Sequence, residues 1–176
     1  GRISPEKDLE LLIYTFQKFL EINPDAQLVM LGFKQDRYSQ ELKKLISDLG
    51  LTSNIICKKF VPKSKLLELL DESTYMIFPS KIYDNLPQAV LEAQSIALPV
   101  IAPGIGSLAE IIQDEINGLH YDQNDKNGLF LAISKTDFSF ETYLKMARSG
   151  WELIHEQYSS KGHYDKLMEV TKSVIG

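Results

Sequence analysis

Two acidic residues, Asp84 and Glu92, lie with seven residues between them around the start of an apolar helix that is predicted over Leu86 to Ala97. Almost no face of this helix is polar, so the pattern predicts that the helix is largely buried with Glu92 inside it. A buried carboxylate is costly unless a hydrogen-bond donor satisfies it. Two neighbouring hydroxyl groups of a ligand, such as those of a ribose, would satisfy both of its oxygens. Alternatively, Glu92 forms an ion pair with a core Arg or Lys, or lies on a narrow solvent-facing stripe.

The turn ahead of this helix has the features of an anion site. Asn85 is a natural N-cap and Pro87 suits the first helical turn, so the free backbone N–H groups around Leu86 to Gln88 are expected to open at the end of the preceding strand. Open α/β sheets bind ligands in the crevice beyond the carboxyl ends of their strands. We therefore expect Asn85, Leu86, Pro87 and Gln88 to contact an anionic ligand. Asp84 could instead be an ordinary turn residue.

Two cations, Arg2 and Lys7, lie near the start of the sequence. Pro5 is expected to be the first residue of a helix, which would place Lys7 in the first turn of that helix. The helix dipole disfavours a cation there by roughly 0.3–1 kcal/mol, so the ammonium group needs compensation. A diphosphate that bridges Arg2 and Lys7 would supply it, and so would the neighbouring acids Glu6 and Asp8.

The loop of residues 103–107 contains two glycines and leads into another predicted helix, where it could present N–H groups to a phosphate. Ser107 and Glu110 have the spacing of a capping box, so Glu110 is expected mainly to cap the backbone of that helix. Gly106 is the residue of this loop that we place at the ligand.

The residue patterns of several other kinds of functional site are missing from this sequence. The three histidines, His120, His155 and His163, have no companion Cys or acid at metal-ligand spacing, and no Asp-x-Asp occurs. We predict no bound metal and no cofactor. A Ser-His-Asp or Cys-His constellation is not readable. The Walker phosphate loop and the three-glycine dinucleotide fingerprint are also missing, which counts against a nucleotide hydrolase and a dehydrogenase.

The composition indicates one ordinary domain, which we assign to residues 1–176. A formal net charge of -5 argues against extended nucleic-acid binding. The single cysteine, Cys57, lies in an apolar run and favours a reducing compartment, so we expect a cytoplasmic location. No apolar stretch approaches the roughly 20 residues that a spanning helix needs, and no signal peptide is apparent.

Helical and extended patterns alternate along the chain. Helices are predicted around residues 9–20, 42–49, 66–70, 86–97, 107–112, 140–154 and 162–174, and strands around 28–31, 54–60, 75–78, 99–102 and 118–121. Short apolar strands between amphipathic helices are typical of a parallel sheet with helices on both faces. We predict an α/β, Rossmann-like fold, in which the helices of residues 138–176 pack on the sheet or reach toward a missing partner domain. Because the sequence opens without Met, just ahead of a helix start, we expect a domain of a longer protein.

Six segments, in this order and spacing, closely resemble the C-terminal domain of retaining glycosyltransferases of family 4, often described as "glycosyl transferases group 1". They are Gly1 to Lys7, Phe78-Pro79-Ser80, Asp84-x7-Glu92-Ala93, Leu98 to Ala102, Gly106-Ser107-x-x-Glu110 and Asn117-Gly118. In that family two Rossmann-like domains face each other in the GT-B arrangement, and the C-terminal domain holds a nucleotide-sugar donor. The resemblance therefore implies an N-terminal acceptor domain that is absent from this chain.

The resemblance also implies roles for the charged residues. Glu92 matches the second acid of a paired-acid motif and would bind the ribose hydroxyls. Asp84 takes the place of the first acid, which contacts the donor sugar, and is one methylene shorter than the usual Glu. Arg2 and Lys7 match the cations that neutralise the diphosphate. We take these four residues as the catalytic set.

Further donor contacts are implied in the same way. The loop of residues 85–88 matches the one whose backbone meets the sugar and the phosphate, and Gly106 belongs to the matched glycine loop. Phe60 and Val61 fall where the base is usually flanked. Two departures from the family pattern look tolerable: Ala97 and Leu98 replace a glycine-containing turn, and Asp8 stands where glycine is common.

The activity implied is transfer of a sugar, with retention at the anomeric carbon, from a UDP- or GDP-sugar to a glycan or lipid-linked acceptor. The cations and the helix N-terminus would stabilise the leaving diphosphate without a metal. The acceptor would bind through the missing N-terminal domain, and the full protein could associate peripherally with a membrane. The alternatives are a non-catalytic module that binds nucleotide sugars or mediates interactions, and a nucleotide-sugar epimerase of the same architecture.

Overall fold

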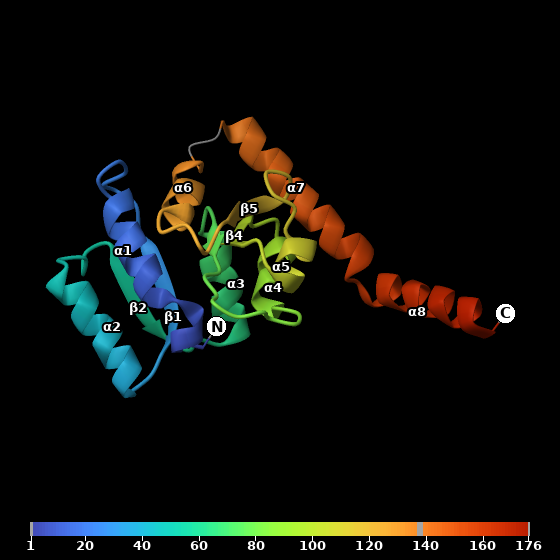
Figure 1. Cartoon of the computed structure of the whole chain (residues 1–176), viewed down its shortest axis with the longest axis horizontal. Helices are drawn as coiled ribbons and strands as arrows, with labels where there is room; N and C mark the ends of the chain where they lie inside the picture. Colours follow the sequence, from blue (N-terminus) through green and yellow to red (C-terminus); the bar gives the residue numbers. More distant parts are fainter. Residues whose placement is uncertain (1, 137–138, 176) are drawn as a thin grey trace.

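The computed structural model describes residues 2–136 and 139–175 and confirms the predicted α/β fold class (Figure 1). Its helices are the 3-10 helix η1 (Pro5–Lys7), α1 (Leu9–Phe19), α2 (Arg37–Asp48), α3 (Lys63–Asp71), α4 (Gln88–Ser95), α5 (Gly106–Ile111), α6 (Gly128–Ser134), α7 (Phe140–Gln157) and α8 (Ser160–Ile175). Its strands are β1 (Leu28–Phe33), β2 (Ile55–Lys59), β3 (Met76–Ile77), β4 (Val100–Pro103) and β5 (Gly118–Tyr121).

The strand pairs are all parallel, as the sequence predicts. Among the described residues they form two sheets, one with the order β1-β2 and one with the order β3-β4-β5. Parallel strands need helical crossovers between them, which accounts for the alternation of elements along the chain. The carboxyl ends of β3, β4 and β5 consequently lie at one edge of their sheet.

Two hydrophobic clusters hold the helices and the two sheets together. The larger cluster joins α1, α2 and α6 to strands of both sheets, with Ile13, Met30 and Leu119 among its buried members. The smaller cluster lies between α4, α5 and β4, and Ile154 of α7 closes it. Because the larger cluster contains residues from both sheets, the two sheets share one core.

The helices differ from the prediction in three details. The first helix is two elements, because Asp8 adopts a left-handed conformation with φ 45° between η1 and α1. Helix α4 starts at Gln88 and ends at Ser95, so it is shorter than the predicted 86–97. Helix α6 was not predicted, since its apolar run of Leu129 to Ile133 is too short to show a helical period.

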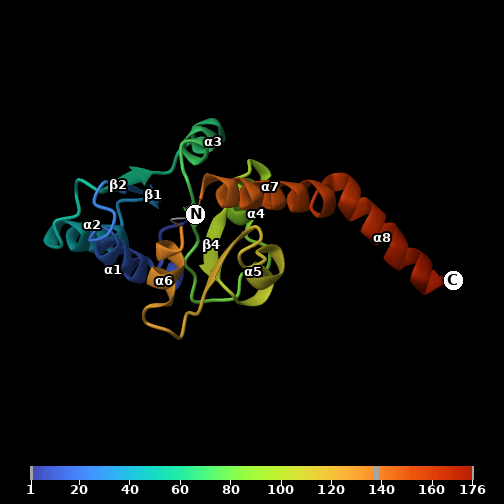
Figure 2. The ribbon, with the colours of Figure 1, turned by 90° about the horizontal axis from the view of Figure 1, so that it is seen from above.

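The C-terminal helices differ in how they pack. Helix α7 lies against α4 and β5, whereas α8 contacts α7 and projects away from the rest of the molecule (Figures 1 and 2). Of the two arrangements predicted for these helices, packing on the sheet describes α7, whereas α8 extends away from the sheet. In the described parts of the chain, no helix combines the length and apolar composition that crossing a membrane requires.

Asn117 fastens the loop between α5 and β5 to its surroundings. Its side chain is buried, its Oδ1 accepts a hydrogen bond from the Gln113 N–H at 2.7 Å, and its Nδ2 donates to the Ile111 carbonyl at 3.0 Å. Its own carbonyl accepts a hydrogen bond from Gln94 of α4 at 3.2 Å. The next residue, Gly118, packs so closely that an added Cβ would lie 2.3 Å from the Val100 carbonyl oxygen.

Replacement of Asn117 by Ala should therefore lower the free energy of unfolding by about 1–3 kcal/mol, because the buried Ile111 carbonyl and the partly buried Gln113 N–H lose their partner. Urea unfolding followed by circular dichroism measures this difference. The matched control is Asn124→Ala at an exposed position, which should change the free energy by less than about 0.5 kcal/mol. Equal losses in the two variants would contradict this assignment.

Candidate functional site

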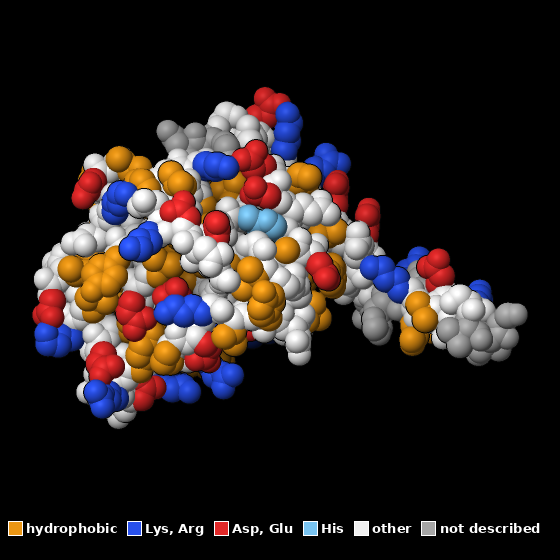
Figure 3. Space-filling model, viewed as in Figure 1, with side chains coloured by type: hydrophobic (Ala, Val, Ile, Leu, Met, Phe, Trp, Pro, Cys, Tyr) orange, Lys and Arg blue, Asp and Glu red, His pale blue; other side chains and the backbone are white. Residues whose placement is uncertain are grey.

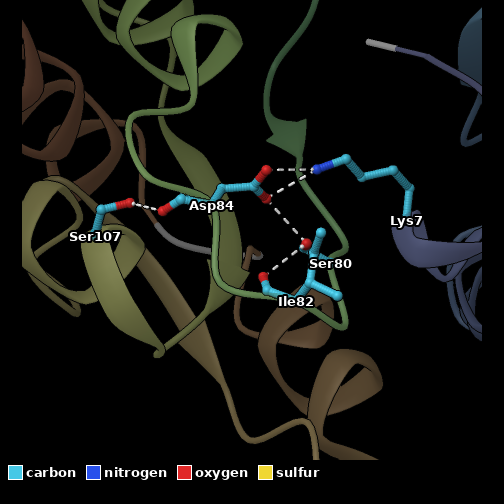
Figure 4. A network of polar contacts seen from close by, with 5 residues as sticks. All are labelled: Lys7, Ser80, Ile82, Asp84 and Ser107. Atoms are coloured by element: carbon cyan, nitrogen blue, oxygen red, sulfur yellow. Dashed lines mark hydrogen bonds and ion pairs between the residues drawn. The ribbon is translucent and has the colours of Figure 1, made fainter.

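The strongest polar cluster lies at the carboxyl edge of the β3-β4-β5 sheet, in the loop that follows β3 (Figure 4). Lys7 Nζ lies 2.8 Å and 3.0 Å from the two carboxylate oxygens of Asp84. The Ser80 hydroxyl donates to Asp84 Oδ2 at 3.0 Å. The Ser107 hydroxyl donates to the main-chain carbonyl of Asp84. Residues far apart in the sequence thus meet on one aspartate.

Pro5 starts a helix and Lys7 lies in its first turn, as predicted, but this helix is the short η1 and ends at Lys7. The acid that compensates the ammonium group is Asp84 instead of Glu6 or Asp8. The ammonium group also lies 4.6 Å from the centre of the Phe78 ring, within the range of a cation–π interaction. The Lys7 and Asp84 side chains are only 20% and 23% exposed, so the pair is partly shielded from water.

Two contacts of Lys81 dock η1 on the loop after β3. The Lys81 backbone N–H donates to the Glu6 carbonyl at 2.9 Å, and the Lys81 ammonium pairs with Asp8 at 2.9 Å. The Asp8 carboxylate raises the pKa of Lys81 through this hydrogen bond. Together with the Lys7–Asp84 pair, these contacts fix the start of the described chain at the edge of the sheet.

Glu92 does not occupy the interior position that the sequence predicts. Its side chain is 34% exposed, and Oε1 lies 3.7 Å from the Nζ of Lys63, which is itself 75% exposed. The apolar residues of α4 cover a narrower face than their number suggests, and Val90 and Ala93 point into the core. Glu92 is therefore accessible to solvent, and its ion pair with Lys63 is of the exposed kind that contributes little.

The turn before α4 is also arranged differently from the prediction. Pro87 rather than Asn85 precedes the helix, and no side chain caps its first turn. The Val90 and Leu91 N–H groups bond to the Pro87 carbonyl, which leaves the N–H groups of Gln88 and Ala89 as the first of the helix. Asn85, Leu86 and Gln88 are exposed, while Pro87 is buried.

The predicted capping box at Ser107 and Glu110 is wrong. Ile105 precedes helix α5 without a side-chain cap, and the Ser107 hydroxyl bonds to the Asp84 carbonyl instead. The neighbouring Gly106 has φ 50°, and a Cβ on it would lie 2.7 Å from Cδ1 of Tyr83. Gly106 therefore allows the loop that carries Asp84 to approach α5.

The remaining predicted residues lie on the surface. Phe60 is 84% exposed, and Val61 is half-buried, both directly after β2. Arg2 is exposed. The pKa of Glu6 is lowered mainly by its own backbone N–H and then by the Ser4 hydroxyl, with smaller contributions from the charges of Arg2 and Lys7. Among the described residues, no hydrogen bond or ion pair connects Arg2, Phe60 or Glu92 to the Lys7–Asp84 cluster.

Sequence reasoning assigned no role to Ser80 or Tyr121. Ser80 is almost completely buried, and the sequence feature that could have indicated it is a small hydroxyl residue in the loop shortly after an apolar strand. Tyr121 ends β5, and burial raises the pKa of its hydroxyl to about 12, against a smaller lowering by the Ser80 backbone. Its hydroxyl is therefore neutral at pH 7 and lies near Ser80.

The described part of the visible surface has no extended basic patch that would attract anions. On the face shown in Figure 3, basic and acidic side chains are interspersed rather than gathered into one patch. Within the described residues, no cluster of three or more His, Cys, Asp and Glu side chains could hold a metal ion. Attraction of an anion to this site would have to come from local groups.

Comparison with known proteins gives a consistent set of relatives. The family described as "Glycosyl transferases group 1" matches residues 1–136. The chain is 27% identical over 182 residues to the putative glycosyltransferase YtcC of Bacillus subtilis, covering 99% of the chain and 44% of YtcC. It thus spans less than half the length of this curated relative.

Solved structures show the same fold. The C-terminal domain of a glycosyl transferase group 1 family protein, LpcC of Francisella tularensis, aligns with a TM-score of 0.79 at 22% identity, covering 91% of this chain and 84% of that one. Anabaena Alr3699/HepE in complex with UDP aligns with a TM-score of 0.84 at 19% identity, covering 98% of this chain and 47% of that one.

Two substitutions can distinguish the effect of the close approach between Gly106 and Tyr83 from the energetic cost of placing a side chain on a left-handed backbone. Gly106→Ala and the control Gly50→Ala both place a side chain at positive φ, and each should cost about 1–2 kcal/mol of stability. Only Gly106→Ala should displace the exposed Tyr83 ring, because no atom lies within 4 Å of a Cβ on Gly50. Denaturant unfolding and the NMR signals of the Tyr83 ring measure the two effects. Unchanged ring signals in Gly106→Ala would refute the contact.

Proposed function

Because this chain belongs to the glycosyl transferases group 1 family, we propose that it binds the nucleoside-diphosphate sugar from which such an enzyme transfers the sugar. The observation that carries the proposal is the cluster of Lys7, Asp84, Ser80 and Ser107 at the carboxyl edge of a parallel sheet, where open α/β folds bind ligands. The similarity of fold to a protein that binds UDP supports it.

In the proposed complex the diphosphate lies over Lys7 and the start of α4. Lys7 Nζ and the exposed Arg2 neutralise its charge, and the first N–H groups of α4 with the loop of residues 85–88 donate hydrogen bonds to its oxygens. Asp84 meets the donor sugar while it holds Lys7. Gly106 lets the loop after β3 stay close to α5 beside that sugar.

The nucleoside would lie on the exposed side of α4. The Glu92 carboxylate accepts hydrogen bonds from the two ribose hydroxyls, at a lower desolvation cost than a fully buried carboxylate because it is already partly exposed. Phe60 and Val61, after β2, flank the base. An aromatic ring that is 84% exposed in the free protein gains contact area when a base stacks on it.

The chemistry we propose is transfer with retention at the anomeric carbon. As the glycosidic bond breaks, the leaving nucleoside diphosphate takes up negative charge. Lys7 and the N-terminus of α4 are fixed donors for that charge, so they stabilise the transition state more than the ground state, and the exposed Arg2 adds a second cation. We propose that these groups act without a metal ion.

The acceptor, which we propose to be a glycan or a lipid-linked glycan, would bind to a second domain of a longer, cytoplasmic protein. The relatives are more than twice as long as the part of them that this chain matches. Residues that handle the acceptor proton would belong to that domain. The chain of 176 residues should then bind donor weakly and transfer little sugar.

UDP or GDP should protect this chain against thermal unfolding. At a concentration one hundred times the dissociation constant, the nucleotide should add about 2.7 kcal/mol to the free energy of unfolding. For a chain of this size that raises the midpoint by roughly 5–11 °C. Glu92→Ala or Arg2→Ala should remove the protection, because each deletes a proposed contact. Differential scanning calorimetry measures the midpoints.

The matched controls for this experiment are surface residues with similar charge. Glu115→Ala and Arg37→Ala each remove an exposed side chain that forms an ion pair away from the site, and both should keep the protection. If Glu92→Ala and Arg2→Ala also keep it, the assignment of these residues is wrong.

A longer protein that contains this chain should transfer sugar with retention. Proton NMR of the product gives the anomeric configuration, which should equal that of the donor. Donor binding without product for any acceptor would favour the non-catalytic module instead. Isomerised donor in the absence of an acceptor would identify an epimerase.

A further inference from the structure

Ser80 is the most deeply buried polar residue of the site. It is 1% exposed and lies three residues beyond the end of β3. Its hydroxyl oxygen is 3.0 Å from Asp84 Oδ2 and 3.1 Å from the Ile82 carbonyl oxygen. A hydroxyl has one proton to donate, so these two acceptors share it, and the charged one binds it more strongly.

Asp84 is restrained through both its side chain and its main chain (Figure 4). The Ser80 hydroxyl binds the carboxylate, while the Ser107 hydroxyl from α5 binds the backbone carbonyl. The carboxylate therefore has a defined position in the free protein. Without Ser80, one carboxylate oxygen would keep only its contact with Lys7 at 2.8 Å among the hydrogen bonds of the described residues.

The position of Asp84 decides the position of the Lys7 ammonium group. A lysine side chain has four flexible carbons and loses much rotamer freedom when it is held in one place. Here the two Asp84 oxygens and the Phe78 ring hold it. Two of its three N–H donors can be used by the carboxylate, so one remains for a further acceptor.

We infer that Ser80 is a positioning residue, which acts through Asp84 to fix the Lys7 ammonium group so that its remaining N–H points to the donor diphosphate. The part that concerns the diphosphate rests on the proposed function. The fixed ammonium group is prepared before the ligand arrives, so less conformational entropy is lost on binding. Ser80 itself contacts no ligand in this arrangement.

A double-mutant cycle with UDP tests this role. Isothermal titration of UDP into the chain should give a dissociation constant about fivefold higher for Ser80→Ala, which corresponds to about 1 kcal/mol. In an Asp84→Asn background the same change should have less than about a twofold effect, because the carboxylate that Ser80 aligns is gone. The matched control is Ser73→Ala, whose hydroxyl bonds to the Leu69 carbonyl at the opposite end of β3, and it should leave the constant unchanged.

A second measurement needs no ligand. Nitrogen-15 relaxation of the lysine ammonium groups should show that the Lys7 ammonium group is more mobile in Ser80→Ala than in the unmodified chain or in Ser73→Ala. Unchanged mobility of Lys7, or an equal effect of Ser80→Ala in both Asp84 backgrounds, would overturn the positioning role. Increased mobility in a chain that binds neither UDP nor GDP would support the positioning of Lys7 and reject donor binding.

Discussion

The ion pair between Lys7 and Asp84 is the contact on which the arrangement of the site depends. It joins residues separated by 77 positions, and it brings the first turn of the chain onto the loop after β3. Asp8 makes this geometry accessible, because its left-handed conformation ends η1 and lets α1 start in a new direction. If Pro5 to Phe19 formed one continuous helix, the side chain of Lys7 would be directed by that helix rather than by the loop after β3.

The arrangement of the strands places this contact at the kind of edge where open α/β sheets bind ligands. Strands β3, β4 and β5 are neighbours in one parallel sheet, so their carboxyl ends lie at the same edge. The loop that leaves the carboxyl end of β3 carries Ser80 and Asp84. Topology and side-chain chemistry therefore indicate the same edge of the sheet.

The sequence predicted those features that depend on local pattern. Alternating apolar strands and amphipathic helices gave the fold class, and the helix predicted after the glycine-containing segment is present as α5, which already begins at Gly106. Features that depend on distant contacts were missed. Ser107 had the spacing of a local cap, but the Asp84 carbonyl, 23 residues earlier, takes its hydroxyl. The count of apolar residues in α4 suggested a buried Glu92, yet counting cannot show how much of that helix its neighbours cover.

The pairing of Lys7 with Asp84 also affects how the cluster would attract the proposed diphosphate. A neutralised lysine adds little long-range field, and the surrounding surface carries interspersed charges (Figure 3). In the proposed complex, preference for the diphosphate then depends on the directions of its hydrogen-bond donors, which are one N–H of the Lys7 ammonium group and the first N–H groups of α4. The negative charge of Asp84 weakens the attraction of Lys7 for an anion. In return, Asp84 holds the Lys7 ammonium group in a fixed position as a hydrogen-bond donor. Fixed donors are what the stabilisation of a developing charge requires, because they need no rearrangement as that charge forms.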